Sequence, residues 1–183
     1  MKILGVDHGT RYAGWAVVSL EGDAMVFEGH GLLDMTGFTH PEVLRVLKNR
    51  AGRLIDQWNP DVVALEKPMA MRSGKVARLL IEMYAACEIA ALERHKAIMP
   101  VTPQLAKLYA AGHGAADKED VALALQAKYG LDYDEIAVPL YYKTGKRKGE
   151  VRERLWDVSD ACALCVAAVE LIKAQVQVEV GQA

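Results

Sequence analysis

The chain has 183 residues, 52% hydrophobic and 25% charged, which is typical of one globular domain and excludes two full-sized ones. Its 22 basic and 24 acidic residues give a net charge of −2, which counts mildly against a nucleic-acid-binding protein, yet residues 143–154 hold six basic and two acidic side chains. No apolar run reaches the roughly 18 to 20 residues that span a bilayer, and the N-terminus does not resemble a signal peptide, so we expect a cytoplasmic protein.

Three strands are predicted first in the chain, over residues 2–7, 13–20 and 24–33, with a polar turn at 21–23. Strands joined by short polar turns are typical of an antiparallel meander. An amphipathic helix is predicted next, over residues 41–58, because apolar residues recur there at helical spacing. Its apolar stripe consists of Val43, Leu44, Leu47, Leu54 and Ile55.

The second half of the chain alternates strands and helices. Strands are predicted over 61–66 and 97–101, and helices over 74–95, 103–111, 117–129 and 157–175. Thr102 followed by Pro103 is typical of an N-cap with proline at the first helical position. Residues 130–156 are predicted to be an inserted basic loop and residues 176–183 a disordered tail.

This order of elements, β-β-β-α-β-α-β-α-α-α, favours an α/β fold with a mixed sheet and helices packed on its faces. The sequence contains no internal repeat and no linker, so we expect one domain over residues 1–175.

The three cysteines, Cys87, Cys162 and Cys165, lie in apolar surroundings and do not suggest a disulfide framework. Cys162 and Cys165 have the CxxC spacing of some zinc and redox sites. No second CxxC and no nearby histidine accompanies them in the sequence, so two buried small side chains are the favoured interpretation.

Four carboxylates fall at three places in the predicted pattern. Asp7 ends the first strand, Glu66 ends the fourth, and Asp157 and Asp160 begin the last helix. An acid that closes an apolar strand is costly to bury unless it is compensated, and ligands of open α/β sheets bind at the carboxyl ends of strands. Asp157 and Asp160 are three residues apart and share a helix face, so all four acids converge if that helix crosses the strand ends.

Converging carboxylates repel one another unless cations neutralise them, and carboxylate oxygens are ligands that Mg²⁺ prefers. Two such ions, typically ~3.5–4 Å apart, activate water and stabilise the leaving oxygen in a phosphoryl displacement. Each acid alone has a simpler interpretation, as a turn residue, an exposed loop residue or a helix cap. Taken together, the four favour a metal-dependent nuclease.

Five segments resemble the RuvC family of Holliday-junction resolvases. They are GVDHGTRYAGW at 5–15, NPDVVALE at 59–66, the helix from residue 74 with Leu79, Ala90 and Ala91, residues 102–118 with Lys107, Gly112, Gly114 and Lys118, and DVSDACA at 157–163. No single segment is specific, but five in this order are. The resemblance covers residues 2–172 apart from the insertion.

The resemblance implies an RNase H-like fold with a mixed five-stranded sheet and helices on both faces, a homodimer, and paired symmetric nicks across a four-way DNA junction. Two equivalent scissile phosphates call for two sites related by a two-fold axis. The resemblance also implies two Mg²⁺ ions per site, for which Mn²⁺ can substitute, held by Asp7, Glu66, Asp157 and Asp160. Lys118 resembles a lysine that approaches the cleaved phosphate, where it would stabilise transition-state charge.

The sequence departs from the family pattern at three places. His8 stands where relatives commonly have proline, and Met69 where many carry an aromatic residue that stacks near the junction centre. The segment 130–156 is longer than in the typical bacterial enzyme. These departures favour a divergent, phage-type member in a bacterial or phage-infected cell, and they leave a branch-migration motor unsupported as a partner.

Basic residues at several places are candidates for contact with DNA phosphates, which position a duplex without reading its sequence. Three of them follow Glu66 at a spacing of three, where a solvated helix face is the alternative, and four lie in the insertion, where a solvated loop is the alternative. The complete set is Arg72, Lys75, Arg78, Lys107, Lys118, Lys143, Lys146, Arg147 and Lys148.

Three other functions compete with a junction resolvase. Sugar kinases and actin-like ATPases share a first strand ending in Asp-x-Gly-Thr, but they need two such domains, and 183 residues are too few. A YqgF-like nuclease acting on RNA shares the opening motif, and the residues do not decide between RNA and a DNA junction. A non-catalytic adaptor of the same fold has no need to gather four negative charges beside DNA.

Overall fold

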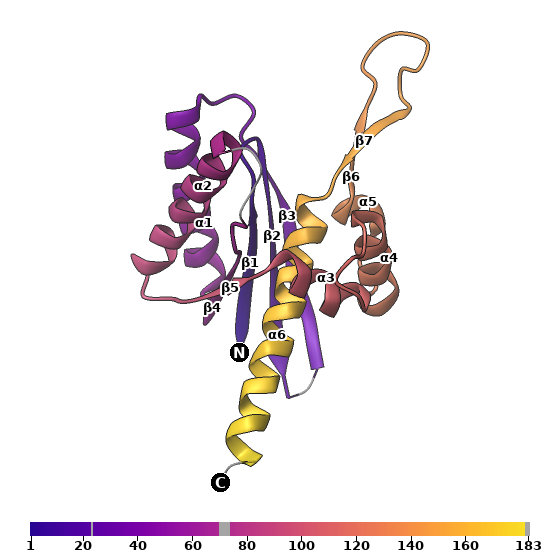
Figure 1. The fold of residues 1–183 in the computed structure, drawn as a ribbon. Coiled ribbons are helices and arrows are strands. Elements are labelled where there is room, and N and C mark those ends of the chain that lie inside the picture. Colours follow the sequence, from indigo (N-terminus) through magenta and orange to yellow (C-terminus); the bar gives the residue numbers. More distant parts are fainter. Residues whose placement is uncertain (23, 70–73, 182–183) are drawn as a thin grey trace.

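Five strands form the central sheet in the order β3-β2-β1-β4-β5 (Figure 1). The computed structural model of the chain describes residues 1–22, 24–69 and 74–181. The strands are β1 (Lys2–His8), β2 (Tyr12–Glu21), β3 (Ala24–Asp34), β4 (Val62–Glu66) and β5 (Ala97–Val101). The first three pair antiparallel, and β4 and β5 run parallel to β1, so the predicted meander and mixed sheet are confirmed.

Helices cover both faces of this sheet, as the sequence predicted. On one face lie α1 (His40–Trp58) and α2 (Gly74–Leu92), and on the other lie α3 (Pro103–Ala111), α4 (Lys118–Tyr129), α5 (Tyr133–Ile136) and α6 (Asp157–Gly181). The core is correspondingly in two layers, because successive strand residues point to opposite faces. In β1, Leu4 and Val6 are buried against α1 and α2, whereas Ile3 is buried in the layer that holds α6.

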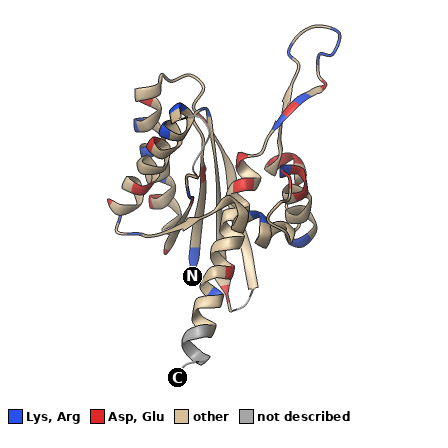
Figure 2. Ribbon diagram, viewed as in Figure 1, with Lys and Arg blue, Asp and Glu red and all other residues tan. Residues whose placement is uncertain are grey.

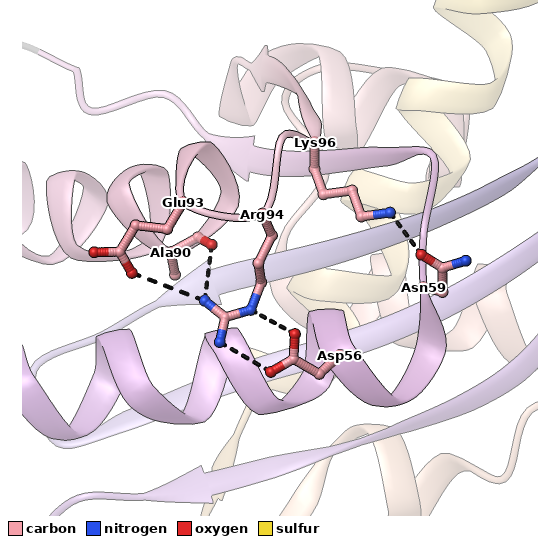
Figure 3. Close-up of polar contacts among 6 residues, drawn as sticks. All are labelled: Asp56, Asn59, Ala90, Glu93, Arg94 and Lys96. Atoms are coloured by element: carbon pink, nitrogen blue, oxygen red, sulfur yellow. Dashed lines mark hydrogen bonds and ion pairs between the residues drawn. The ribbon is translucent and has the colours of Figure 1, made fainter.

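A polar cluster fixes the end of α1 to the turn after α2 (Figure 3). The guanidinium of Arg94 donates to both carboxylate oxygens of Asp56, at 2.7 and 2.9 Å, and to the carbonyl oxygen of Ala90 at 3.2 Å. Lys96 donates to the Asn59 side-chain oxygen at 2.6 Å. Bidentate pairing of this kind fixes geometry as well as adding energy, so these contacts hold α1 and α2 together at the edge of the sheet where β4 and β5 begin.

Two predictions about the C-terminal third were wrong. Residues 130–156 are not an irregular loop: they form the short helix α5 and a separate antiparallel hairpin of β6 (Val138–Tyr141) and β7 (Val151–Leu155). The last helix does not end near residue 175 before a disordered tail, but continues to Gly181. No glycine or proline lies between Asp157 and Gly181 to end the helix earlier.

Other boundaries are close to the predictions. The Thr102 hydroxyl accepts a hydrogen bond from the Leu105 backbone N–H at 3.3 Å, so the predicted N-cap of α3 is confirmed. All three cysteines are buried and free, as expected for small core side chains. Within the described residues, no helix combines the length and the apolar character needed to cross a membrane.

Candidate active site

Two of the four predicted acids meet because β1 and β4 are adjacent parallel strands. Val6 is paired with Leu65, so the next residue on each strand, Asp7 and Glu66, stands at the same carboxyl end of the sheet. Their side chains follow the parity of Ile3 and Ala64, both of which are buried in the layer that contains α6. The strand register therefore directs both acids toward the helix that carries the other two.

Glycines let the first turns of α6 lie directly on the sheet. A Cβ atom built on Gly14 in β2 would stand 1.8 Å from the carbonyl oxygen of Asp157, and one on Gly5 in β1 would stand 2.5 Å from that of Ala161. Because both obstacles are backbone atoms, no side-chain rotation could relieve the contact. This close approach brings Asp157 and Asp160 to the strand ends, as the sequence predicted, although the role of the glycines themselves was missed.

A cavity of about 250 Å³ opens where these elements meet. Charged groups line one part of it, and small or branched apolar residues of α3, α4 and α6 line the rest. The lining consists of Asp7, Glu66, Pro103, Ala106, Lys107, Lys118, Val121, Asp160 and Ala163. Asp157 is not among these residues, but its charge acts on two of them, Asp7 and Lys118.

The acids perturb one another's protonation. Burial raises the pKa of Asp7 well above its ordinary value of 3.8, and the charges of Asp160, Glu66 and Asp157 raise it further. Burial and the Asp160 charge raise the pKa of Glu66, and burial raises that of Asp157. Carboxylates that are forced together in this way favour a bound cation, and a cleft with such shifts is a candidate functional site.

Lys118, at the first position of α4, supplies a positive charge to this cluster. Its Nζ donates to Asp160 Oδ2 at 2.7 Å. Burial lowers the pKa of Lys118, but the charge of Asp160 and the hydrogen bond to it, with the charges of Asp7 and Asp157, outweigh burial and raise the pKa, so the side chain stays an ammonium. Lys107 also lines the cavity, and its charge, with that of Lys118, offsets part of the rise in the pKa of Glu66.

The oxygen donors fit a hard divalent ion better than a soft one, because they are carboxylates with no thiolate or imidazole among the cavity-lining side chains. Within residues 1–22, 24–69 and 74–181, no three His, Cys, Asp or Glu side chains form a preassembled metal-binding group. The Lys118 ammonium is instead paired with Asp160. The carboxylate donors are thus chemically suited to Mg²⁺ or Mn²⁺. Binding such an ion would require the acids to move closer together.

His8 is a buried residue beside the site, and its position differs from that of a turn. It is the last residue of β1, and its Nε2 lies 2.9 Å from the carbonyl oxygen of Glu66. Burial lowers the pKa of His8, so the ring is neutral and Nε2–H donates this bond. Its ring makes an edge contact with Tyr84 of α2 at 5.6 Å between centroids. His8 thus ties the end of β1 to the end of β4.

The predicted DNA-contact residues are in different situations. Arg72 lies outside the described residues. Lys75 borders a second cavity with Thr10 and Phe38, and Arg78 is paired with Glu82 at 2.8 Å on the exposed face of α2. The four basic residues of the insertion, Lys143, Lys146, Arg147 and Lys148, lie at the exposed tip of the β6–β7 hairpin.

Comparison with known proteins places this chain in a family. The family described as crossover junction endodeoxyribonuclease RuvC matches residues 3–134. The RuvC of Akkermansia muciniphila is 36% identical over 130 residues, which are 69% of this chain and 77% of the relative. The RuvC of Dictyoglomus thermophilum is 26% identical over 170 residues, covering 92% and 96% of the two chains.

Solved structures extend the likeness over the whole fold. Thermus thermophilus RuvC in complex with a Holliday junction substrate matches with a TM-score of 0.71 and 22% identity, over 97% of this chain and 96% of that chain. The same protein without the substrate named matches with a TM-score of 0.68 over 97% of each chain. The fold is therefore the RNase H-like α/β fold that the sequence predicted. The chain belongs to the RuvC family of crossover junction endodeoxyribonucleases.

Proposed function

We propose that this chain resolves four-way DNA junctions by paired, symmetric nicks, through metal-dependent hydrolysis of phosphodiester bonds. The observation that carries the proposal is the meeting of Asp7, Glu66 and Asp160 with Lys118 in one cavity, with Asp157 near enough for its charge to raise the pKa of Asp7. A module that only bound DNA would not gain from holding four acids beside a polyanion. Membership of the RuvC family supports a DNA junction as the substrate.

In this proposal Asp7, Glu66, Asp157 and Asp160 hold two Mg²⁺ ions, or Mn²⁺ in their place. Two divalent ions so bound would activate water and neutralise charge on the leaving oxygen. Lys118 gives up its pairing with Asp160 and turns its ammonium to the scissile phosphate, where it stabilises the charge that develops in the transition state. Lys107, which also lines the cavity, would hold a neighbouring phosphate oxygen.

We further propose that the active form is a homodimer assembled through α2. Met83, Cys87 and Ala90 of α2 are buried, whereas Ile81, Ile89 and Leu92 of the same helix are 55%, 46% and 57% exposed. They lie on one side of the helix, next to an apolar groove between α1 and α2 that Leu44, Ala85 and Ala86 also line. Covering such a surface with a second copy would present two active sites to the two strands that are cut.

A cleavage assay tests the activity. Wild type and Asp7→Asn are incubated with a synthetic four-way DNA junction and Mg²⁺, beside linear duplex and structured RNA. We expect symmetric nicks on the junction alone, lost in Asp7→Asn. If the RNA is cut and the junction stays intact, the protein is a nuclease whose substrate is RNA. If no substrate is cut, a non-catalytic adaptor is favoured.

Thermal unfolding tests the metal site without relying on activity. Mg²⁺ or Mn²⁺ should raise the Tm of the wild type, because a ligand that binds the folded state stabilises it by RT ln(1 + [L]/Kd). The same titration should leave the Tm of Asp7→Asn nearly unchanged. Equal metal-induced shifts in both proteins would remove Asp7 from the proposed ligand set.

We place this activity in the cytoplasm of a bacterial or phage-infected cell. The three buried, unpaired cysteines suit a reducing compartment, where disulfides are rare.

A further inference from the structure

The β6–β7 hairpin stands away from the body of the molecule (Figure 1). Its strands pair only with each other, in a two-stranded sheet separate from the central one. Every side chain from residue 143 to residue 153 is exposed. An isolated two-stranded hairpin gains little stability from its own contacts. Val138 at its base packs against the core, but the exposed part beyond the base adds nothing to the core that would account for the length of the hairpin.

The base of the hairpin is nevertheless firmly held, and it is joined to the active site. Arg154 in β7 donates to Asp134 at 2.7 Å and to the Ala137 carbonyl oxygen at 2.6 Å, and its guanidinium lies 4.7 Å from the centroid of the Tyr133 ring. Trp156 alone separates β7 from Asp157. The contacts of Arg154 therefore fix the hairpin two residues before α6 begins with Asp157, the first of its two acids.

The tip is an ordered turn that carries unpaired positive charge. Backbone bonds between Tyr142 and both Glu150 and Gly149, each of 3.0 Å, close it. Arg147 is satisfied internally, by Glu150 at 2.6 Å and by the face of the Tyr142 ring. Three lysines remain, and no acid of the described residues pairs with any of them: Lys143, Lys146 and Lys148.

Charge is divided along the hairpin (Figure 2). The turn is basic, whereas the segment at its base contains Asp132, Asp134 and Glu135, of which Asp134 is paired with Arg154. A polyanion would be repelled from the base and attracted to the tip. At roughly 3.3 Å per residue, the five steps from Leu155 back to Glu150, where the turn begins, carry the tip about 17 Å from the base, the length of about five base pairs.

We infer that the β6–β7 hairpin is a DNA-binding arm whose tip lysines grip the phosphates of one duplex arm of the junction, beside the strand that is cut. The inference rests on the proposed junction-cleaving function and adds to it a second contact, outside the cavity. The arm positions the duplex and does not take part in the chemistry, so it affects affinity and not the rate of the bound complex.

A charge-removal experiment tests the arm. The tip variant Lys143→Ala/Lys146→Ala/Lys148→Ala leaves Arg147 and the turn intact. Its control, Arg53→Ala/Lys96→Ala/Lys173→Ala, removes the same charge from the end of the molecule opposite the strand ends that carry the acids. Kd for a four-way junction is measured in EDTA, so that the DNA stays whole, across a range of salt concentrations.

The tip variant should bind about tenfold to a hundredfold more weakly near 0.15 M salt, and the slope of log K against log salt should fall by about 0.9 for each lysine that contacts a phosphate. Its single-turnover cleavage rate at saturating protein should match the wild type. If the tip variant binds as tightly as the wild type, or if the control variant loses as much affinity, the hairpin is not a DNA-binding arm. Either result leaves the proposed junction cleavage unaffected. Absence of cleavage by the wild type would overturn the proposed function instead.

A tethered cleavage reagent locates the tip on the DNA. The native cysteines are buried, and burial raises the pKa of Cys87 and Cys165 to about 12, so an introduced thiol is the reactive one. Iron–EDTA attached to Thr144→Cys should cut the backbone within one arm of the junction, whereas the same reagent on Gln57→Cys should leave that arm intact. If the reagent at position 144 does not cut the DNA, the inference is contradicted.

Discussion

Asp7 lies in an environment that destabilises the folded protein but suits the binding of a cation. Its carboxylate is drawn out of water and faces three other acids, with the Lys118 ammonium as the nearest compensating charge. Each pKa unit by which the folded state raises an acid corresponds to about 1.4 kcal/mol of destabilisation once the unfolded chain ionises. Functional sites commonly hold residues that reduce stability, so the cost at Asp7 is itself a sign of function.

Asp7→Asn should therefore stabilise the protein in EDTA while it abolishes cleavage. Because folding raises the pKa of Asp7, stability is full below the ordinary value of 3.8 and is lost as pH rises from there through the folded-state pKa. We expect the Tm at pH 7 to rise by at least about 2–4 °C, the shift that 1 kcal/mol produces in a protein of this size. The gain should vanish below about pH 4, and Glu21→Gln, at an exposed acid, should show none.

The Lys118 ammonium is proposed to have two partners: the Asp160 carboxylate when DNA is absent and the scissile phosphate when DNA is bound. Lys118→Ala should keep the junction affinity but slow single-turnover cleavage by about 10²- to 10³-fold, the usual loss when one transition-state donor is removed. Binding and cleavage of the same junction are measured side by side, with Lys96→Ala as the control. Unchanged cleavage in Lys118→Ala would show that the ion pair with Asp160 is only structural.

At the scale of whole elements, the site depends on how closely α6 approaches the sheet. Gly14 and Gly5 leave room for the backbone of the helix, and nothing larger would fit without moving it. A glycine inside a strand is a recognised signal of close backbone approach, and that signal was present in the sequence. It identifies the contact but not the partner, because the partner, Asp157, lies 143 residues further along the chain.

Gly14→Ala should displace the start of α6 and with it two of the four acids. The added methyl group meets backbone atoms 1.8 to 2.6 Å away, so we expect a loss of about 1–3 kcal/mol or more in stability, together with loss of Mg²⁺ binding. Gly37→Ala is the matched control, because a Cβ there has open space. Urea unfolding measures both variants, and equal midpoints would contradict the packing argument.

The elements that carry the acids could be predicted because their patterns are local. Short apolar runs that end in an acid define β1 and β4, and an apolar face with two acids at its start defines α6. The β6–β7 hairpin could not be predicted in the same way, since its strands are half-buried near the base and exposed toward the tip, with no alternation of buried and polar positions. The length of α6 was missed because the sequence after residue 175 lacks the periodic apolar face that marks a packed helix.

At the scale of the whole molecule, the proposed paired nicks require two active sites that act together. Among the residues that the structure describes, these acids gather at one place in each chain, so symmetric nicks need a second copy placed by a two-fold axis. The exposed apolar residues of α2 lie on the face of the sheet opposite α6, which leaves the cavity free to meet DNA in a dimer built through α2.

Ile81→Glu/Ile89→Glu should separate the dimer into monomers by burying like charges at its interface. Light scattering should give about twice 20.0 kDa for the wild type and about 20 kDa for this variant, with Leu123→Glu on α4 as an exposed control. On a plasmid with an extruded cruciform, paired nicks yield linear DNA and single nicks yield open circles. The wild type should give linear product and the monomeric variant open circles, because each cavity would remain intact while the coupling between the two was lost. A wild type that was monomeric and still gave linear DNA would mean that α2 faces solvent and that the junction itself brings the two copies together.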